Sequence, residues 1–205
     1  MDENSPAKQY TVAVLLFEDF ETLDVFGPVE IFGRLKDHYK VSFYSLAGGL
    51  VSNYHGVSIL SQPLDALTAC DIFLVPGGYG TRPGVENAIL IDFLREISNK
   101  TNRVLTVCTG TALLAKTGLL DGRKATTNKR AFDWVVAQRE QVEWVKKARW
   151  VKDGKFYTSA GVSAGMDMVL GFLADQHGLE FARKVAFEIE YDWTENSEED
   201  HFYLQ

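Results

Sequence analysis

The chain has 205 residues, of which 46% are hydrophobic and 24% are charged, a composition typical of an ordinary globular protein with one core. The formal net charge of -7 argues against nucleic acid or an anionic membrane as a partner, because both require a basic surface. The apolar runs are far shorter than the roughly 20 residues that span a bilayer, and no secretory signal pattern is present. We therefore expect a single cytoplasmic domain over residues 1–205.

Short apolar runs rich in β-branched or aromatic residues predict buried strands. They cover residues 10–17, 41–46, 72–75 and 104–107. Helical patterns lie between most of these strands. One begins near Thr22, where Pro28 predicts a kink or a later start, and the others cover residues 85–98 and 109–116.

The second half of the chain continues this alternation. Two strands are expected at residues 148–152 and 155–158, joined by an Asp-Gly turn, and two helices follow at 164–176 and 179–187. Residues 52–64 alternate weakly and predict a small hairpin or a sheet edge, and the acidic tail from Thr194 is expected on the surface. Buried strands alternating with helices predict an α/β fold, a doubly wound sandwich with a mostly parallel central sheet.

Cys108 follows directly on the strand expected at residues 104–107, and a helix is expected to begin within two residues of it. Such a turn would place the sulfur at the carboxyl edge of the sheet, where open α/β folds bind ligands. The nearby helix N-terminus would favour the thiolate. A small buried core residue fits the local pattern equally well. Cys70 precedes a strand and has no such turn, so we interpret it as structural.

Two further segments also follow predicted strands. Glycines at 77, 78 and 80 would let the backbone approach a ligand and leave amide groups free, although their spacing is not a dinucleotide fingerprint. Glu21 and Asp24 are spaced i, i+3 and could share one helix face. A carboxyl group beside Cys108 could act as acid, base or hydrogen-bond donor, provided that its own pKa is raised.

At these segments the chain resembles the ThiJ/PfpI superfamily, which is class I glutamine amidotransferase-like and has a flavodoxin-like fold. The resemblance runs from Tyr10 to about Trp193. It is carried by the motifs LDVFGP (23–28), VPGG (75–78), VCTGT (107–111), GLLDGRKATT (118–127) and TSAGVSAGMD (158–167). Together these motifs are most similar to the isocyanide (isonitrile) hydratase branch and to the sensor domains of AraC-type regulators.

The resemblance implies roles for five residues. Cys108 matches the nucleophile of the family, and Asp24 matches the carboxylate of the hydratases. Gly78 and Thr109 match backbone amides near the sulfur. Glu21 matches the protonated glutamate that lies beside the cysteine in other branches, so the partner of Cys108 remains open between Asp24 and Glu21.

One position departs from the family pattern. Asn128 stands where many relatives carry a histidine, and none of the four histidines of this chain matches a catalytic position. The histidines are His38, His55, His177 and His201. A Cys-His dyad is therefore unsupported.

Three functions follow from the resemblance. The first is a cysteine-dependent hydratase that converts an isocyanide and water to an N-substituted formamide, without metal or organic cofactor. The second is a cofactor-free glyoxalase or small-carbonyl hydrolase using Cys108 and Glu21, which the loss of the histidine disfavours. The third is a non-enzymatic redox or stress sensor in which Cys108 is oxidised. The resemblance also implies a homodimer, for which we expect an interface on the apolar stripe after Gly165.

Overall fold

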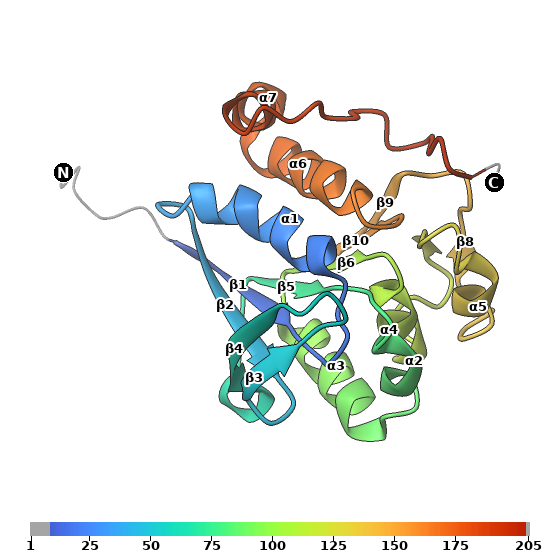
Figure 1. Cartoon of the computed structure of the whole chain (residues 1–205). Helices are drawn as coiled ribbons and strands as arrows, with labels where there is room; N and C mark the ends of the chain where they lie inside the picture. Colours follow the sequence, from blue (N-terminus) through green and yellow to red (C-terminus); the bar gives the residue numbers. More distant parts are fainter. Residues whose placement is uncertain (1–8, 204–205) are drawn as a thin grey trace.

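The structure, a computed structural model, describes residues 9–203. Its strands are β1 (Tyr10–Leu15), β2 (Tyr39–Ser45), β3 (Gly49–Ser52), β4 (Ser58–Pro63), β5 (Ile72–Val75), β6 (Arg103–Val107), β7 (Lys124–Ala125), β8 (Glu143–Trp144), β9 (Trp150–Asp153) and β10 (Phe156–Ser159). Eight of them form one sheet in the order β3-β4-β2-β1-β5-β6-β10-β9, and β7 pairs with β8 (Figure 1). Within the large sheet only β3 and β9 run antiparallel to their neighbours.

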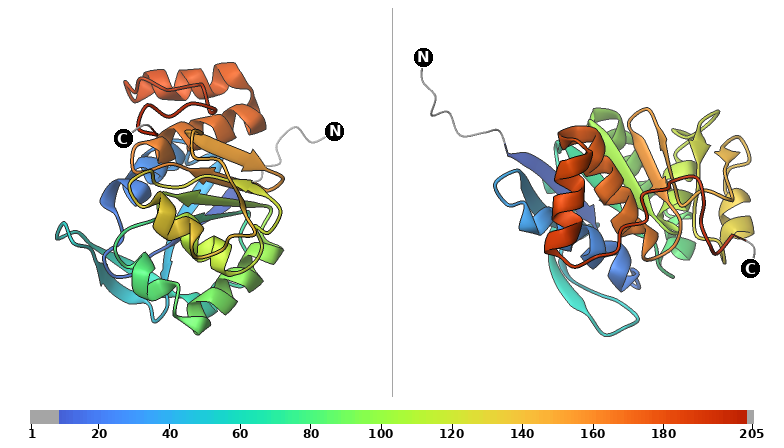
Figure 2. Two further views of the ribbon diagram at one scale, coloured as in Figure 1. Left: turned by 90° about the vertical axis from the view of Figure 1, so that its right-hand side faces the viewer. Right: turned by 90° about the horizontal axis from the view of Figure 1, so that it is seen from above.

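Helices cover both faces of this sheet. They are α1 (Thr22–Arg34), α2 (Thr81–Gly84), α3 (Ala88–Lys100), α4 (Gly110–Lys116), α5 (Phe132–Val136), α6 (Ala164–His177) and α7 (Leu179–Glu188), and a 3-10 turn covers Leu64–Ala66. Helices α1 and α6 lie on one face with α7 outside α6, and α3 and α4 lie on the other face (Figures 1 and 2). The predicted flavodoxin-like α/β sandwich with a mostly parallel sheet is confirmed.

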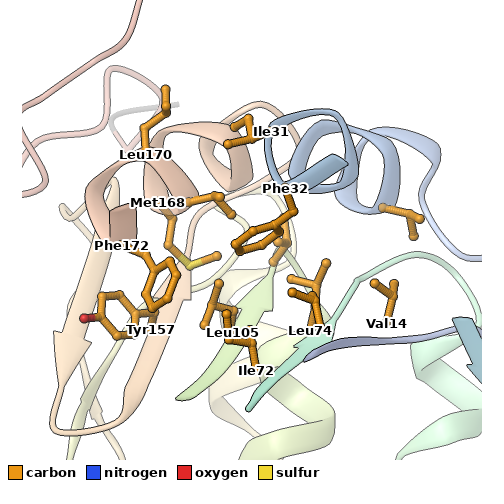
Figure 3. Packing of buried hydrophobic residues seen from close by; sticks show 14 of the residues in the cluster. Val14, Ile31, Phe32, Ile72, Leu74, Leu105, Tyr157, Met168, Leu170 and Phe172 are labelled. Atoms are coloured by element: carbon orange, nitrogen blue, oxygen red, sulfur yellow. The ribbon is translucent and has the colours of Figure 1, made fainter. Parts of the chain in front are cut away.

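Side-chain alternation along the strands builds a core on each face of the sheet. In β1, Val12 and Val14 pack on the side of α1 and α6, whereas Ala13 and Leu15 pack on the side of α3 and α4. Figure 3 shows Phe32 of α1 and Met168 and Phe172 of α6 meeting side chains of the central strands, such as Leu74, Leu105 and Tyr157. Because both faces are covered, the strands read as continuous apolar runs.

For the first helix, Pro28 predicted either a kink or a later start, and the structure contradicts the later start. It begins at Thr22 and continues through Pro28 to Arg34, so the later start was wrong. Proline removes one internal hydrogen bond of the helix, but the buried side chains of Val25, Ile31 and Phe32 hold the helix against the sheet. The hairpin or sheet edge expected for residues 52–64 is present as β3 and β4 at the edge of the sheet, but β3 begins earlier than expected, at Gly49.

The acidic C-terminal segment is docked rather than lying free on the surface. The Ser197 carbonyl accepts hydrogen bonds from the backbone amides of Arg149 (2.8 Å) and Trp150 (3.2 Å), and Asp200 is 1% exposed. In Figure 1 the segment runs from α7 to the region of β8 and β9. Most of its described side chains are exposed, so the segment does lie on the surface as expected. Its docking was not expected, because long-range pairing of this kind leaves no local pattern in the sequence.

The apolar stripe of α6 lies inside the core. Of its five side chains Met166 is partly buried, and Met168, Val169, Leu170 and Phe172 are at most 2% exposed, so these four cannot form a dimer interface. The stripe instead packs against α1 and the sheet. No helix within residues 9–203 is both long and apolar enough to cross a membrane.

Candidate active site

Cys108 lies in a sharp turn between β6 and α4. The strand ends at Val107, the helix begins at Gly110, and Cys108 has a φ of 57°. A non-glycine residue seldom adopts this left-handed conformation. A side chain at Gly110 would start 2.4 Å from the Val75 carbonyl oxygen, so the turn also requires glycine there. The sulfur is thereby presented at the carboxyl edge, where the loops after β1, β5, β6 and β10 meet.

Hydrogen bonds from two other loops hold this turn. The backbone amide of Cys108 donates to the Ala160 carbonyl (3.1 Å), and the Thr127 hydroxyl donates to the Cys108 carbonyl (2.7 Å). These neighbours come from the loop after β10 and the loop after β7. A left-handed residue persists only where the surrounding structure fixes it in this way.

The Cys108 sulfur is nearly enclosed and lies close to backbone amides. Cys108 as a whole is 6% exposed. The backbone amides of Thr109 and Val162 lie close enough to the sulfur to oppose the rise of its pKa, while the Thr109 hydroxyl donates to the Gly78 carbonyl (3.3 Å). Val162 itself has a left-handed φ of 50°, which turns its amide toward this edge. Amide donors of this kind stabilise negative charge on sulfur or on an atom bonded to it.

Asp24 is the carboxyl group that lies against Cys108. It is fully buried in the first turn of α1, and its Oδ2 accepts a hydrogen bond from the Gly77 amide (2.9 Å). Its Oδ1 is buried without a hydrogen-bond partner among residues 9–203. The carboxyl and the thiol lie close enough that each shifts the pKa of the other. One carboxyl oxygen is therefore held in place and the other is free for a reactant.

Burial favours the neutral form of both groups. Loss of water raises the pKa of Asp24 well above its ordinary value and the nearby Glu21 charge adds to the increase, while the Gly77 amide and the Cys108 thiol oppose it. Burial likewise raises the pKa of Cys108, followed by the Asp24 charge, against the opposing amides. The expected net stabilisation of the thiolate by the helix N-terminus is thus outweighed.

Glu21 lies beside His55, and the pKa of Cys108 is shifted by Asp24 and not by Glu21. It is the N-cap residue of α1 with extended backbone (φ -75°, ψ 127°), and its Oε1 lies 3.8 Å from Nδ1 of His55. The same imidazole nitrogen lies 2.7 Å from the Thr22 hydroxyl, which ties the start of α1 to the β3–β4 hairpin. Glu21 is thus the residue before the helix, its charge acts on Asp24, and the shared helix face stays a prediction.

The glycine loop after β5 positions the neighbours of the sulfur. The Gly78 amide donates to the Thr109 hydroxyl (3.1 Å) rather than to Cys108. Gly78 has a φ of 129°, and a side chain there would start 2.3 Å from the Asp19 carbonyl oxygen. Gly77 supplies the amide that holds Asp24. Gly78 and Thr109 therefore lie at the site. Of these two residues, Thr109 acts on the sulfur and Gly78 does not.

Asn128 packs beside the site without a titratable group. Its Oδ1 accepts a hydrogen bond from the Ala131 amide (3.0 Å), and its amide packs on Gly161 so closely that a side chain at Gly161 would clash. His38 and His177 lie together at the opposite edge of the sheet, with ring centroids 5.4 Å apart, and His201 is exposed. Among the described residues no histidine contacts the Cys108 sulfur.

A cavity of about 230 Å³ adjoins this arrangement on the side of β10. It is lined by Asn128, Lys129, Arg130, Gly161, Val162, Ser163, Asp200 and Phe202. The cavity touches the site through Val162, whose amide lies close to the Cys108 sulfur, and through the loop that begins with Thr127. It is closed on one side by the docked C-terminal segment.

Sequence reasoning missed two groups of the site and most of the cavity. The amides of Gly77 and Val162 both lie within motifs that carried the resemblance, but nothing local distinguishes them from their neighbours. Lys129 and Asp200 gave no signal because a charged residue is exposed by default. Within residues 9–203 no group of three or more His, Cys, Asp or Glu side chains is arranged to hold a metal ion.

Comparison with known proteins places most of the chain in one family. The model of the DJ-1/PfpI family matches residues 10–175. The chain is 30% identical to an isonitrile hydratase of Pseudomonas putida over 88% of this chain and 78% of that protein. It is also 32% identical to the HTH-type transcriptional regulator CdhR of Pseudomonas aeruginosa, over 78% of this chain but 47% of the regulator.

Solved structures show the same architecture. A ThiJ/PfpI family protein from Pseudomonas syringae superimposes with a TM-score of 0.81 and 26% sequence identity. The superposition covers 90% of this chain and 76% of that one. The whole arrangement of sheet and flanking helices is therefore shared with known proteins.

Proposed function

This chain belongs to the DJ-1/PfpI family, and we propose that it is a cysteine-dependent isocyanide hydratase, which forms an N-substituted formamide from an isocyanide and water. The observation that carries the proposal is the pairing of Cys108 with Asp24, a buried carboxyl with a raised pKa and one free oxygen. A neutral carboxyl beside a thiol can pass a proton without holding a second negative charge. The similarity to an isonitrile hydratase supports the same assignment.

The first half of the reaction adds the thiol across the terminal carbon of the isocyanide. The Cys108 sulfur forms a bond to that carbon, and Asp24 gives its proton to the same carbon while it accepts the thiol proton. The product is a thioimidate, in which the carbon carries one hydrogen and is double-bonded to nitrogen. The amides of Thr109 and Val162 stabilise the charge that develops on sulfur.

The second half of the reaction hydrolyses the thioimidate and regenerates the free Cys108 thiol. Asp24 gives its proton to the thioimidate nitrogen and takes a proton from water as the water oxygen bonds to the thioimidate carbon. The carbon–sulfur bond then breaks, the sulfur takes the proton held by Asp24, the new hydroxyl group returns its proton to Asp24, and the formamide leaves. Isocyanide plus water thus gives formamide with no change in oxidation state and no cofactor.

The other two functions receive less support. A glyoxalase or hydrolase would use Glu21 and a histidine at position 128, but Glu21 faces His55 and position 128 is asparagine. A redox sensor would require an accessible thiol of low pKa. Burial instead raises the pKa of Cys108 and leaves it 6% exposed.

The test is formation of formamide from a panel of alkyl and aryl isocyanides, followed by NMR or chromatography. We expect turnover by the natural chain and none by Cys108→Ala. Methylglyoxal, assayed in parallel for conversion to lactate, is expected to remain unchanged. Absence of formamide from every isocyanide, or methylglyoxal loss in its place, would refute the proposal.

A further inference from the structure

The cavity beside Val162 has an unusual charge for this acidic chain. Lys129 lines it and is 9% exposed, with its ammonium donating to the Thr126 hydroxyl (2.9 Å) and the Ala148 carbonyl (2.6 Å). Arg130 lines the same cavity from a more exposed position. None of the ion pairs formed within residues 9–203 includes either side chain. The whole chain nevertheless carries a net charge of -7.

The acidic residue of the cavity is already engaged. Asp200 lies 3.6 Å from a guanidinium nitrogen of the buried Arg149 and accepts a hydrogen bond from the Phe202 amide (3.0 Å). Arg149 is also paired with Asp167 at 2.7 Å. Arg149 thus faces two carboxylates, whereas the hydrogen bonds of the Lys129 ammonium go to neutral acceptors and the Asp200 charge acts on it without an ion pair.

A buried ammonium that forms no ion pair is unfavourable. Burial lowers the pKa of Lys129 to about 8, which the Asp200 charge opposes and the charges of Arg149 and Lys146 reinforce. An anion placed in the cavity would relieve this cost and would gain a charge-assisted hydrogen bond. The cavity volume of about 230 Å³ leaves room for a small carboxylate.

We propose that this cavity binds a carboxylate carried by the substrate, with Lys129 as its buried partner and Arg130 at its rim. The inference rests on the proposed function, because the cavity adjoins Cys108 through Val162 and the loop of Thr127. It names the substrate class as isocyanides whose nitrogen substituent bears a carboxylate. The corresponding products are N-formyl amino carboxylates.

The decisive comparison uses isocyanoacetate and its methyl ester, which differ in charge but share the reacting group. We expect the natural chain to process the carboxylate with a kcat/KM at least about tenfold above that of the ester. Lys129→Met should lower kcat/KM for the carboxylate by about tenfold to a hundredfold and leave the ester within about threefold. Equal kcat/KM for both substrates in the natural chain would overturn the inference.

Two further variants guard against a folding artefact. Arg130→Gln changes an exposed side chain, so the fold should persist, and it should lower the preference for the carboxylate by a few-fold. Lys146→Gln removes the same charge from an exposed neighbour outside the cavity and should leave the preference unchanged. A uniform loss with both substrates, or an equal effect of Lys146→Gln, would contradict a specific role of the cavity.

The pH dependence provides an independent readout. Lys129 is charged below a pKa of about 8 and becomes neutral above it. The ratio of the two kcat/KM values should therefore fall by up to about tenfold between pH 7 and pH 9. Titration of Cys108 and Asp24 affects both substrates and cancels in this ratio. A ratio that stays constant over this range would exclude Lys129 as the charged partner.

Binding can be measured without turnover. N-formylglycine should shift the backbone amide NMR signals of Gly161 and Val162, its amide analogue N-formylglycinamide should not, and Lys129→Met should abolish the shift. If isocyanides are not hydrated but N-formylglycine still binds in this way, the proposed function fails while the anion site stands. If isocyanides are hydrated and N-formylglycine causes no such shift, the anion site fails while the function stands.

Discussion

The two cysteines of this chain share burial and differ in their neighbours. Cys70 and Cys108 are 8% and 6% exposed, and burial raises the pKa of each thiol. Cys70 precedes β5 and its sulfur lies 3.4 Å from the Thr101 hydroxyl, with its pKa raised to about 11. Cys108 follows β6 in a left-handed turn, against a carboxyl group and two backbone amides. Burial is common to the two thiols, so the neighbouring groups are what distinguish Cys108 from Cys70.

The largest effect should come from removing each thiol in turn. Cys108→Ala should lower isocyanide hydration by about a thousandfold or more, because no other nucleophile lies at the turn. Cys70→Ala should leave kcat within about twofold and lower the free energy of unfolding by about 1 kcal/mol. The measurements are formamide formation and denaturant unfolding. Comparable loss of activity in both variants would contradict the claim that Cys108, and not Cys70, is the nucleophile.

The second effect concerns the carboxyl that distinguishes the two thiols. Asp24→Asn should lower turnover by about a hundredfold or more, since the amide cannot relay the proton. Cys108 should still be alkylated by iodoacetamide in this variant. Glu21→Gln should change turnover by a small factor, because its side chain faces His55. A larger loss in Glu21→Gln than in Asp24→Asn would reverse the assignment.

The pH dependence of stability tests the burial of Asp24. Its folded-state pKa is raised, so the folded state binds a proton more tightly than the unfolded state, whose carboxyl titrates near about 3.9. Folding stability due to this group therefore falls as the pH rises above about 4. The asparagine of Asp24→Asn does not titrate, so this variant does not lose stability in this way. The Tm of the variant minus the Tm of the natural chain should therefore increase by a few degrees between pH 4 and pH 7. A difference in Tm that is constant with pH would contradict the raised pKa.

The smallest and most general prediction concerns assembly. We predict a homodimer, and light scattering should then give twice the 23.0 kDa mass of the chain. The four buried side chains of the α6 stripe cannot supply the interface. Exposed apolar side chains on α1, such as Leu23 and Phe26, each 37% exposed, remain available. A monomer at micromolar concentration would refute this prediction.

The main elements of the fold were predictable because their signals are local. Each central strand is covered on both faces, so it reads as an unbroken apolar run, and the helices of each layer carry their own periodic pattern. The strand-to-helix turn at Cys108 followed from the same patterns. The short elements α2, β7, α5 and β8 were not expected, since two to five residues are too few to show a period.

The amino-acid sequence by itself determined the α/β alternation, the turn that places Cys108 at the carboxyl edge of the sheet, and the candidate carboxylates near Cys108. Only the tertiary structure showed which of the two carboxyl groups acts on Cys108, and it is Asp24. Glu21 is the extended N-cap and stays partly exposed, while the first helical turn buries Asp24. The sign of the Cys108 pKa shift and the burial of Lys129 were decided in the same way. Both depend on water excluded by segments distant in the chain, which no local pattern encodes.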